Sequence, residues 1–373
     1  MTERDRLLKV YRGETPDRVP FYLDLSHWFY EKNKVPFDLS VAVHEPEHDL
    51  LACHREFGAG FAIPNRISYF DVSYPAEVRP SVSRDQTARG VELTWTIETP
   101  LGVIRRKRLW NEGSYSWGIS EWGIRSERDL RVLGYALSRA RFHPAWERYD
   151  CWREAVGEIG VPYLSIGYSA AGQLLNYWMG IEETMFAAAD MPGVLAEVVE
   201  EINANLLTLV DLVCQSPAEI VLLGDNFSSD IQSPRFLEKW SARFYRETFR
   251  RLHAAGKFAA VHVDGRMRGL LAAFASLGAD SIDAVTPAPM GDLTARECRE
   301  EAGNELILSG GVPPSVWIEP ASDDDFRRAV LDWLDLRAQS ARLIAAAGDQ
   351  VPPGAPEHRI RMMRDLVEEF GRY

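Results

Sequence analysis

The sequence contains few cysteines, and none are spaced as a metal-binding or redox pair. Four of the 373 residues are cysteine, and they lie far apart, at Cys53, Cys151, Cys214 and Cys298. This spacing excludes a zinc knuckle or a dithiol redox motif built on Cys-x-x-Cys. We therefore expect reduced thiols and a cytoplasmic protein.

The sequence also lacks long apolar runs and an excess of positive charge. No stretch approaches the roughly 18 uninterrupted apolar residues that cross a bilayer, and residues 1–9 lack the apolar segment of a secretion signal. The formal net charge of −13 argues against binding to nucleic acid or to an anionic membrane. Glycine-rich phosphate loops and Gly-x-Ser-x-Gly do not occur in a useful context, so nucleotide binding and serine hydrolase chemistry are poor hypotheses.

What the sequence does contain is a regular alternation of strand and helix patterns. The predicted strands are Val19–Leu25, Tyr163–Ile166, Ile220–Leu223, Phe258–Val263, Ser281–Val285 and Leu306–Leu308. The predicted helices are His48–Phe57, Pro192–Val213, Pro234–Ala255, Met267–Leu277, Leu293–Glu301, Asp324–Ala346 and Pro356–Phe370. This alternation predicts a parallel sheet, most economically a single closed (β/α)8 TIM barrel over residues 1–373.

Residues 71–122 depart from that alternation. Apolar and polar residues alternate over Val91–Ile97, a turn follows, and the pattern resumes at Val103, which predicts a β-hairpin. The segment is rich in aromatic residues, and we interpret it as an insertion over the barrel. We expect its tryptophans to serve packing and its basic run, Arg105–Arg108, to be a solvated strand edge.

The most informative pair of residues is His262 and Asp264, at the end of the predicted strand Phe258–Val263. Side chains two residues apart on a strand share a face, so these two point the same way. In an α/β barrel the carboxyl ends of the strands carry the chemistry. An imidazole beside a carboxylate can bind a divalent metal or relay a proton, although a lone strand histidine is more often a hydrogen-bonded core residue.

Other predicted strands and connections also end in polar residues, which would converge at the mouth of one barrel. These are Asp24, His27, Asp225, Asn226, Asp283 and Asp349. We predict a catalytic role for Asp225 and substrate contacts for Asp24, His27, Asn226 and Asp283. The alternatives are a turn residue for Asp349 and a helix cap for Asp225.

Several motifs resemble, in order and spacing, the uroporphyrinogen decarboxylase superfamily, which includes corrinoid-dependent methyltransferases. They are Arg12–Pro20, Asn176–Gly180, Gly224–Pro234, the His262 strand, Gly310–Gly311 and Gly348–Pro356. The resemblance covers most of the chain. It implies a TIM barrel, a cytoplasmic enzyme and a homodimer.

The chain departs from true uroporphyrinogen decarboxylases at informative positions. The family's arginine-rich segment corresponds here to Leu23–Trp28, which has no arginine, and its catalytic aspartate falls at Asn65. Asparagine cannot supply the negative charge that stabilises a protonated pyrrole, so Asn65 is expected to contact substrate only. Tyr177 matches the family's active-site tyrosine and is a catalytic candidate. Porphyrinogen decarboxylation is therefore not expected.

The methyltransferase branch binds zinc through His-x-Cys and a distant second cysteine. The corresponding residues here are His262, Asp264 and Asp349, so both thiolates are replaced by carboxylates. The resemblance implies a divalent metal, with zinc first and iron, manganese or cobalt as alternatives. An ion with fewer soft ligands is a stronger Lewis acid, which suits the activation of an ether oxygen.

Three functions remain open from the sequence. The first is a metal-assisted methyltransferase or demethylase that acts on a small O-methylated compound and passes the methyl group to cobalamin on a partner corrinoid protein. The second is a metal-independent decarboxylase or lyase, with His262 and Asp264 as acid and base, Tyr177 as proton donor, and Arg66 or Arg266 on the substrate carboxylate. The third is a carrier that binds a corrinoid or tetrapyrrole without turnover.

Overall fold

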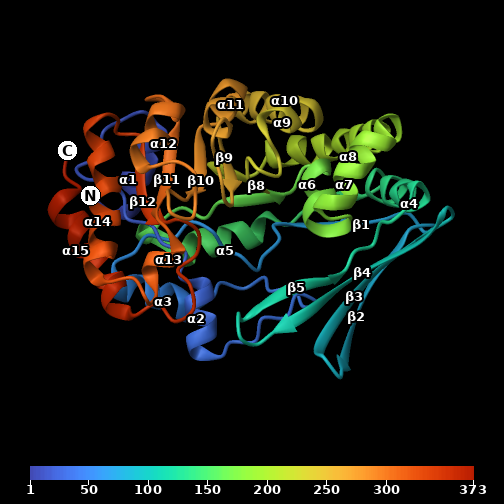
Figure 1. Ribbon diagram of the computed structural model, residues 1–373, viewed down its shortest axis with the longest axis horizontal. Helices are drawn as coiled ribbons and strands as arrows, with labels where there is room; N and C mark the ends of the chain where they lie inside the picture. Colours follow the sequence, from blue (N-terminus) through green and yellow to red (C-terminus); the bar gives the residue numbers. More distant parts are fainter.

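The centre of the computed structural model, which describes residues 1–373, is a six-stranded parallel sheet (Figure 1). In sheet order the strands are β12 (Leu343–Ala347), β11 (Ile307–Val312), β10 (Ser281–Val285), β9 (Phe258–Val263), β8 (Ile220–Phe227) and β7 (Leu164–Gly167). Five of these strands, β7 to β11, start and end within a few residues of the predicted ranges. Their apolar, β-branched sequences are buried on both faces, as parallel strands require.

Two irregular segments close this sheet into a barrel. Phe21 pairs in parallel with Ala345 of β12, Tyr22 pairs with Gly60, and Phe61 pairs with Gly160 just before β7. The predicted strand Val19–Leu25 is therefore present only as isolated bridges. These bridges still complete the (β/α)8 barrel that the sequence predicts.

Helices surround the barrel. Those before β8 are α1 (Glu3–Tyr11), α2 (Ser26–Asn33), α3 (His48–Phe57), α4 (Glu127–Leu137), α5 (Trp146–Val156), α6 (Ala170–Gln173), the π-helical turn η2 (Leu174–Trp178), α7 (Ile181–Asp190) and α8 (Pro192–Val213). Those after β8 are α9 (Pro234–Trp240), α10 (Ala242–Ala254), α11 (Leu270–Leu277), α12 (Ala295–Ala302), α13 (Pro314–Trp317), α14 (Asp323–Leu334) and α15 (Glu357–Phe370). None of the helices is both long and apolar enough to cross a membrane.

The predicted helix Asp324–Ala346 is wrong in its second half. Helix α14 ends at Leu334, and the alanine-rich run Leu343–Ala347 is strand β12. Alanine favours helix by local propensity, but here the run pairs with β11 on one side and with Phe21 on the other. The sheet therefore overrides the local preference of this segment.

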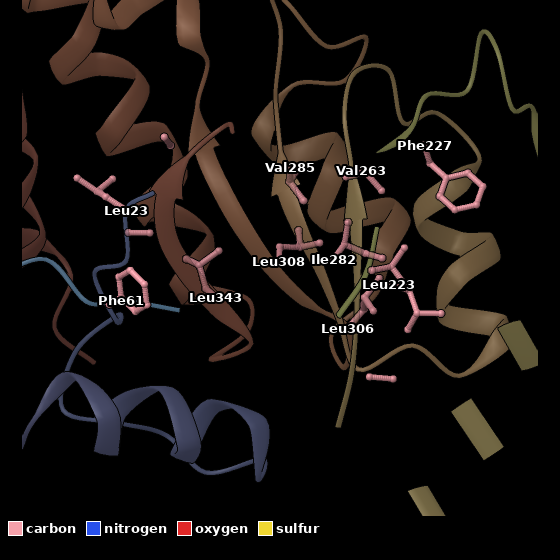
Figure 2. Close-up of a cluster of buried hydrophobic side chains, with 14 of the residues drawn as sticks. Leu23, Phe61, Leu223, Phe227, Val263, Ile282, Val285, Leu306, Leu308 and Leu343 are labelled. Atoms are coloured by element: carbon pink, nitrogen blue, oxygen red, sulfur yellow. The ribbon is translucent and has the colours of Figure 1, made fainter. Parts of the chain in front are cut away.

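The apolar core has one layer outside the strands and one inside the barrel. Between strands and helices, Leu223, Val263, Ile282, Leu308 and Leu343 belong to a single buried cluster (Figure 2). Inside the barrel, a second cluster joins residues of α1 to the strands, among them Leu7, Tyr11, Leu222, Ala260 and Ile344. Helix α1 therefore closes the amino-terminal end of the barrel, and the opposite end is left for a cavity.

The region predicted as a hairpin is an antiparallel sheet of four strands: β2 (Arg79–Thr87), β3 (Gly90–Thr99), β4 (Gly102–Asn111) and β5 (Ser116–Glu121). It projects to one side of the barrel (Figure 1). A short pair, β1 (Phe70–Ser73) with β6 (Arg141–Pro144), ties its two ends together.

The four-stranded sheet is anchored to the barrel at separate places. The side chains of Tyr115 and Trp117 donate to the carbonyl oxygens of Val35 and Phe37, just after α2. The peptide nitrogens of Gly123 and Ile124 donate to Trp178 in η2. The sheet therefore reaches from the barrel side that carries Asp24 to the side that carries β7.

Candidate active site

A cavity of about 410 Å³ opens at the carboxyl ends of the barrel strands, and we call it the acidic cavity. It receives seven of the polar residues singled out from the sequence: Asp24, Asn65, Asn226, His262, Asp264, Asp283 and Asp349. They come from six different strands or connections, which the closed barrel brings together. The lining therefore contains four carboxylates and one basic side chain, that of His262.

His262 is held by the neighbouring strand. Its Nδ1 lies 3.1 Å from Oδ2 of Asp283, and the other carboxylate oxygen of Asp283 accepts a hydrogen bond from Ser309 at 3.1 Å. Burial lowers the pKa of His262, but the hydrogen bond to Asp283 and the charges of the surrounding carboxylates outweigh it and raise the pKa to about 9. With Nδ1 bound to Asp283, the ring has Nε2 left for the cavity.

Asp264 and Asp349 differ from the other carboxylates, because neither accepts a hydrogen bond from the protein. Asp264 is exposed to the cavity mouth and Asp349 is partly buried. Burial raises the pKa of Asp349 to about 6, with a further rise from the charge of Asp264. Both carboxylates therefore lack a donor within the protein and face the cavity, where each can accept a hydrogen bond or bind a cation.

The donor chemistry of His262, Asp264 and Asp349 suits a divalent metal, but their arrangement is not a preformed coordination shell. No group of three or more histidine, cysteine, aspartate or glutamate side chains in the structure is placed to hold a metal ion. The three residues nevertheless line one cavity, and the charges of both aspartates act on His262. Coordination by all three would therefore require the side chains to rotate toward one another.

Asp24 is saturated with hydrogen bonds on the opposite wall. It accepts from the peptide nitrogen and hydroxyl of Ser26 at 2.9 and 2.6 Å, from Asn65 at 2.6 Å and from Gln350 at 3.1 Å. An aspartate at position 65 would face this carboxylate and repel it. The asparagine at position 65 is therefore matched to Asp24.

Asp225, for which a catalytic role is predicted, lies outside the acidic cavity. The residue is fully buried, and its carboxylate accepts from the peptide nitrogen of Ser169 at 2.6 Å and from the Ser169 hydroxyl. Burial raises the pKa of Asp225 to about 6, against these hydrogen bonds, which lower it. A side chain at Gly172 would collide with this carboxylate. Asp225 therefore fixes the connection from β7 to α6.

Tyr177 also lies outside the acidic cavity. It lines a neighbouring apolar cavity of about 360 Å³, and its ring meets that of Tyr168 edge to face at 4.7 Å. Tyr168 lines both cavities, and its hydroxyl donates to Asn226 at 3.2 Å. Tyr168, which the sequence did not single out, therefore reaches the acidic cavity, as Tyr22 and Tyr163 also do.

The remaining sequence candidates are engaged elsewhere. The ring of His27 contacts the carbonyl oxygen of Ser114 at 2.9 Å and so holds the four-stranded sheet rather than a substrate. Arg66 lies 3.3 Å from Glu47, and Arg266 is exposed and lies 3.9 Å from Asp230. Neither arginine lines the acidic cavity, so neither provides the carboxylate anchor that a decarboxylase would need there.

The basic run was the least well predicted feature. Arg105 is solvent-exposed as expected, but Arg106 is 8% exposed and lies among the rings of Trp95, Tyr177 and Trp178. The alternation of β4 could have indicated this, because Arg106 shares a strand face with the buried Ile104.

A barrel whose carboxyl-terminal mouth holds a cavity of titratable groups is the arrangement of TIM-barrel enzymes. Comparison with known families is more specific: the family model described as uroporphyrinogen decarboxylase (URO-D) matches residues 147–370, and the chain belongs to that family. No curated protein sequence matches the chain.

Solved structures resemble the chain to different degrees. A methyltransferase from Methanosarcina mazei has a TM-score of 0.66 and 13% sequence identity, with 99% of this chain and 99% of that chain covered. A D-psicose 3-epimerase from Clostridium cellulolyticum H10 has a TM-score of 0.35 and 11% identity, with 66% of this chain and 83% of that chain covered. The first of these matches shows the same barrel along nearly the whole chain.

Proposed function

We propose that the protein is a methyltransferase-type enzyme that removes the methyl group of a small O-methylated compound in the acidic cavity and passes it to a corrinoid on a partner protein. The observation that carries the proposal is the pair of donor-free carboxylates, Asp264 and Asp349, beside His262. Membership of the URO-D family and a fold shared with a methyltransferase support it.

The residues of the cavity would divide the work. His262, Asp264 and Asp349 would hold a divalent metal, with zinc first, which would supply Lewis acidity toward the substrate oxygen. Asp283 fixes the ring of His262 through Nδ1, an orientation by a neighbouring carboxylate that metal-bound histidines commonly show. The reaction breaks the bond between methyl carbon and oxygen, and the oxygen keeps the electron pair, so its release requires positive charge or a proton at that atom.

The alternative, a metal-independent decarboxylase, has less support from the cavity. A carboxylate substrate would enter a space lined by four aspartates, without arginine or lysine. Tyr177, the proton donor of that alternative, lies in the neighbouring cavity. His262 and Asp264 remain together as an acid and base pair, so the alternative is an outcome that the experiment must be able to show.

The test is metal analysis of the purified and zinc-loaded protein together with methyl transfer to free cobalamin. Asp264→Asn and Asp349→Asn remove one charge each, and Asp190→Asn makes the same change on the exposed end of α7. We expect the two cavity variants to bind zinc at least about tenfold more weakly and to lose methyl transfer, while Asp190→Asn matches wild type.

Two results would contradict the proposal. One is unchanged zinc affinity and unchanged methyl transfer in both cavity variants. The other is activity on carboxylated substrates that survives complete chelation and requires no corrinoid, which would establish the decarboxylase instead.

A further inference from the structure

Two arginines on β4, Arg106 and Arg108, have buried guanidinium atoms but no anionic partner. Arg106 is 8% exposed, and its Nε and Nη1 atoms are buried and make no hydrogen bond. The Nε atom of Arg108 is likewise buried and unpaired. Burying an unpaired charge is costly, so the structure lacks an acceptor that these groups need.

The aromatic rings around the two guanidinium groups satisfy them only in part. The guanidinium carbon of Arg106 lies 4.4 Å from the ring centroid of Trp95 and 4.9 Å from that of Tyr177, and that of Arg108 lies 5.2 Å from Tyr177. Cation–π contacts stabilise a charge but accept no in-plane hydrogen bond from Nε. Burial and the charge of Arg108 lower the pKa of Arg106 to about 10. The neighbouring cation therefore makes the charged form of Arg106 less stable.

The other two residues of the basic run, Arg105 and Lys107, lie on the opposite face of the same sheet. Lys107 points to the opposite face, where it lies 3.1 Å from Glu92. Arg105 is exposed on that same face. The buried, unpaired cations, Arg106 and Arg108, therefore share the face that packs against the barrel.

Neither arginine lines the apolar cavity, but the face that carries them adjoins the cavity through Tyr177. Tyr177 lines the cavity and lies beneath both guanidinium groups. Apolar side chains such as Phe70, Phe142 and Leu206 line most of the remainder. The apolar cavity shares Ser165, Gly167 and Tyr168 with the acidic cavity, so the two spaces meet at one wall.

The charges beside the two cavities are of opposite sign. The acidic cavity holds Asp264 and Asp349 and repels an anion, whereas Arg106 and Arg108 attract one. Guanidinium groups bind carboxylates through paired hydrogen bonds, and an apolar cavity favours a hydrocarbon or aromatic body.

We infer that Arg106 and Arg108 form a carboxylate-binding subsite, and that the enzyme takes an organic acid with an apolar body whose reacting group is remote from its carboxylate. The inference rests on the proposed function in taking the acidic cavity as the place of reaction. It also explains why a carboxylate would be kept away from His262.

The experiment measures binding rather than turnover, by calorimetry on the full-length protein. The probes are 3-phenylpropionate, its neutral amide and acetate, so that charge and apolar body are varied separately. Wild type is compared with Arg108→Gln, and with Arg105→Gln as a control on the opposite face of the same strand. Arg106 is left intact because its removal would empty an aromatic cage.

We expect wild type and Arg105→Gln to bind 3-phenylpropionate at least about tenfold more tightly than the amide or acetate, because hydrogen bonds to charged groups are the stronger ones. Arg108→Gln should bind acid and amide alike, and Arg108→Lys should restore part of the preference. Equal binding of acid and amide by wild type, or equal weakening by Arg105→Gln and Arg108→Gln, would overturn the inference.

Asp349→Asn separates this inference from the proposed function. It removes a proposed metal ligand, but it leaves both arginines in place. We expect the preference for the acid to survive in this variant. If methyl transfer is never observed while the preference depends on Arg108, the subsite stands and the proposed chemistry fails.

Discussion

The protein contains two sets of polar side chains in its barrel, and they differ in what satisfies them. Asp225 is buried and bonded to Ser169, and His54 is buried with its Nδ1 bonded to the carbonyl oxygen of Gly60. Asp264 and Asp349 face the acidic cavity and accept no hydrogen bond. The comparison shows that an aspartate after an apolar strand can either fix a connection or face a cavity without a donor from the protein. Only its partners distinguish the two.

The largest effect on stability should come from the satisfied set. Asp225→Ala leaves the peptide nitrogen and hydroxyl of Ser169 buried without an acceptor, and we expect the free energy of unfolding to fall by about 2–3 kcal/mol. Urea unfolding measures this value. Asp225→Asn keeps one acceptor and should lose less, and an unchanged unfolding midpoint for Asp225→Ala would place Asp225 in the other set.

The second effect depends on pH and concerns His54. Burial lowers the pKa of His54 to about 4, below its usual 6.5, so the unfolded chain binds a proton more readily than the native protein. The stabilisation by neutral His54 is complete above pH 6.5 and is lost as the pH falls from there toward 4. We expect a loss of about 1 kcal/mol between pH 7 and pH 5.5 that is missing in His54→Gln. Parallel stability curves for the two proteins would show that His54 does not titrate on unfolding.

Replacing a carboxylate that accepts no hydrogen bond should not lower the free energy of unfolding. Asp349→Asn removes a charge beside Asp264 without leaving any donor unpaired. We therefore expect the free energy of unfolding to stay the same or to rise by up to about 1 kcal/mol, although the function is impaired. Thermal unfolding without metal measures it, and a loss comparable to that of Asp225→Ala would erase the distinction between the two sets.

A surface ion pair provides the baseline for these effects. The hydrogen bonds from Arg6 lower the pKa of Asp17 to about 2, with its carboxylate 2.7 Å from Nε of Arg6. The stabilisation is therefore present above pH 3.8 and lost as the pH falls through 2. Because Asp17 is half-exposed, Asp17→Asn should cost about 0.5 kcal/mol or less at neutral pH. A cost above that of Asp225→Ala would make partner count a poor guide to stability in this protein.

The sequence predicted the strands whose local and tertiary preferences agree. Phe258–Val263 and Ser281–Val285 have the predicted bounds because β-branched, apolar residues suit a buried parallel strand. Leu343–Ala347 was predicted as helix because its alanines favour helix locally. The closure at Phe21 and Gly60 is irregular backbone whose pairing depends on residues far away in the sequence.

The site shows the same division. Side chains two residues apart on a strand share a face, so the local sequence is enough to place His262 and Asp264 together. The barrel determines which other residues lie near them. Asp283 and Asp349 reach the same cavity from other strands, whereas Asp225 accepts hydrogen bonds from Ser169. The surroundings of Arg106 and Arg108 likewise depend on the four-stranded sheet, which places both guanidinium groups against Tyr177. Sequence fixes the local direction of a side chain, but its hydrogen-bond and charge partners come from distant segments, and only the tertiary structure assembles those.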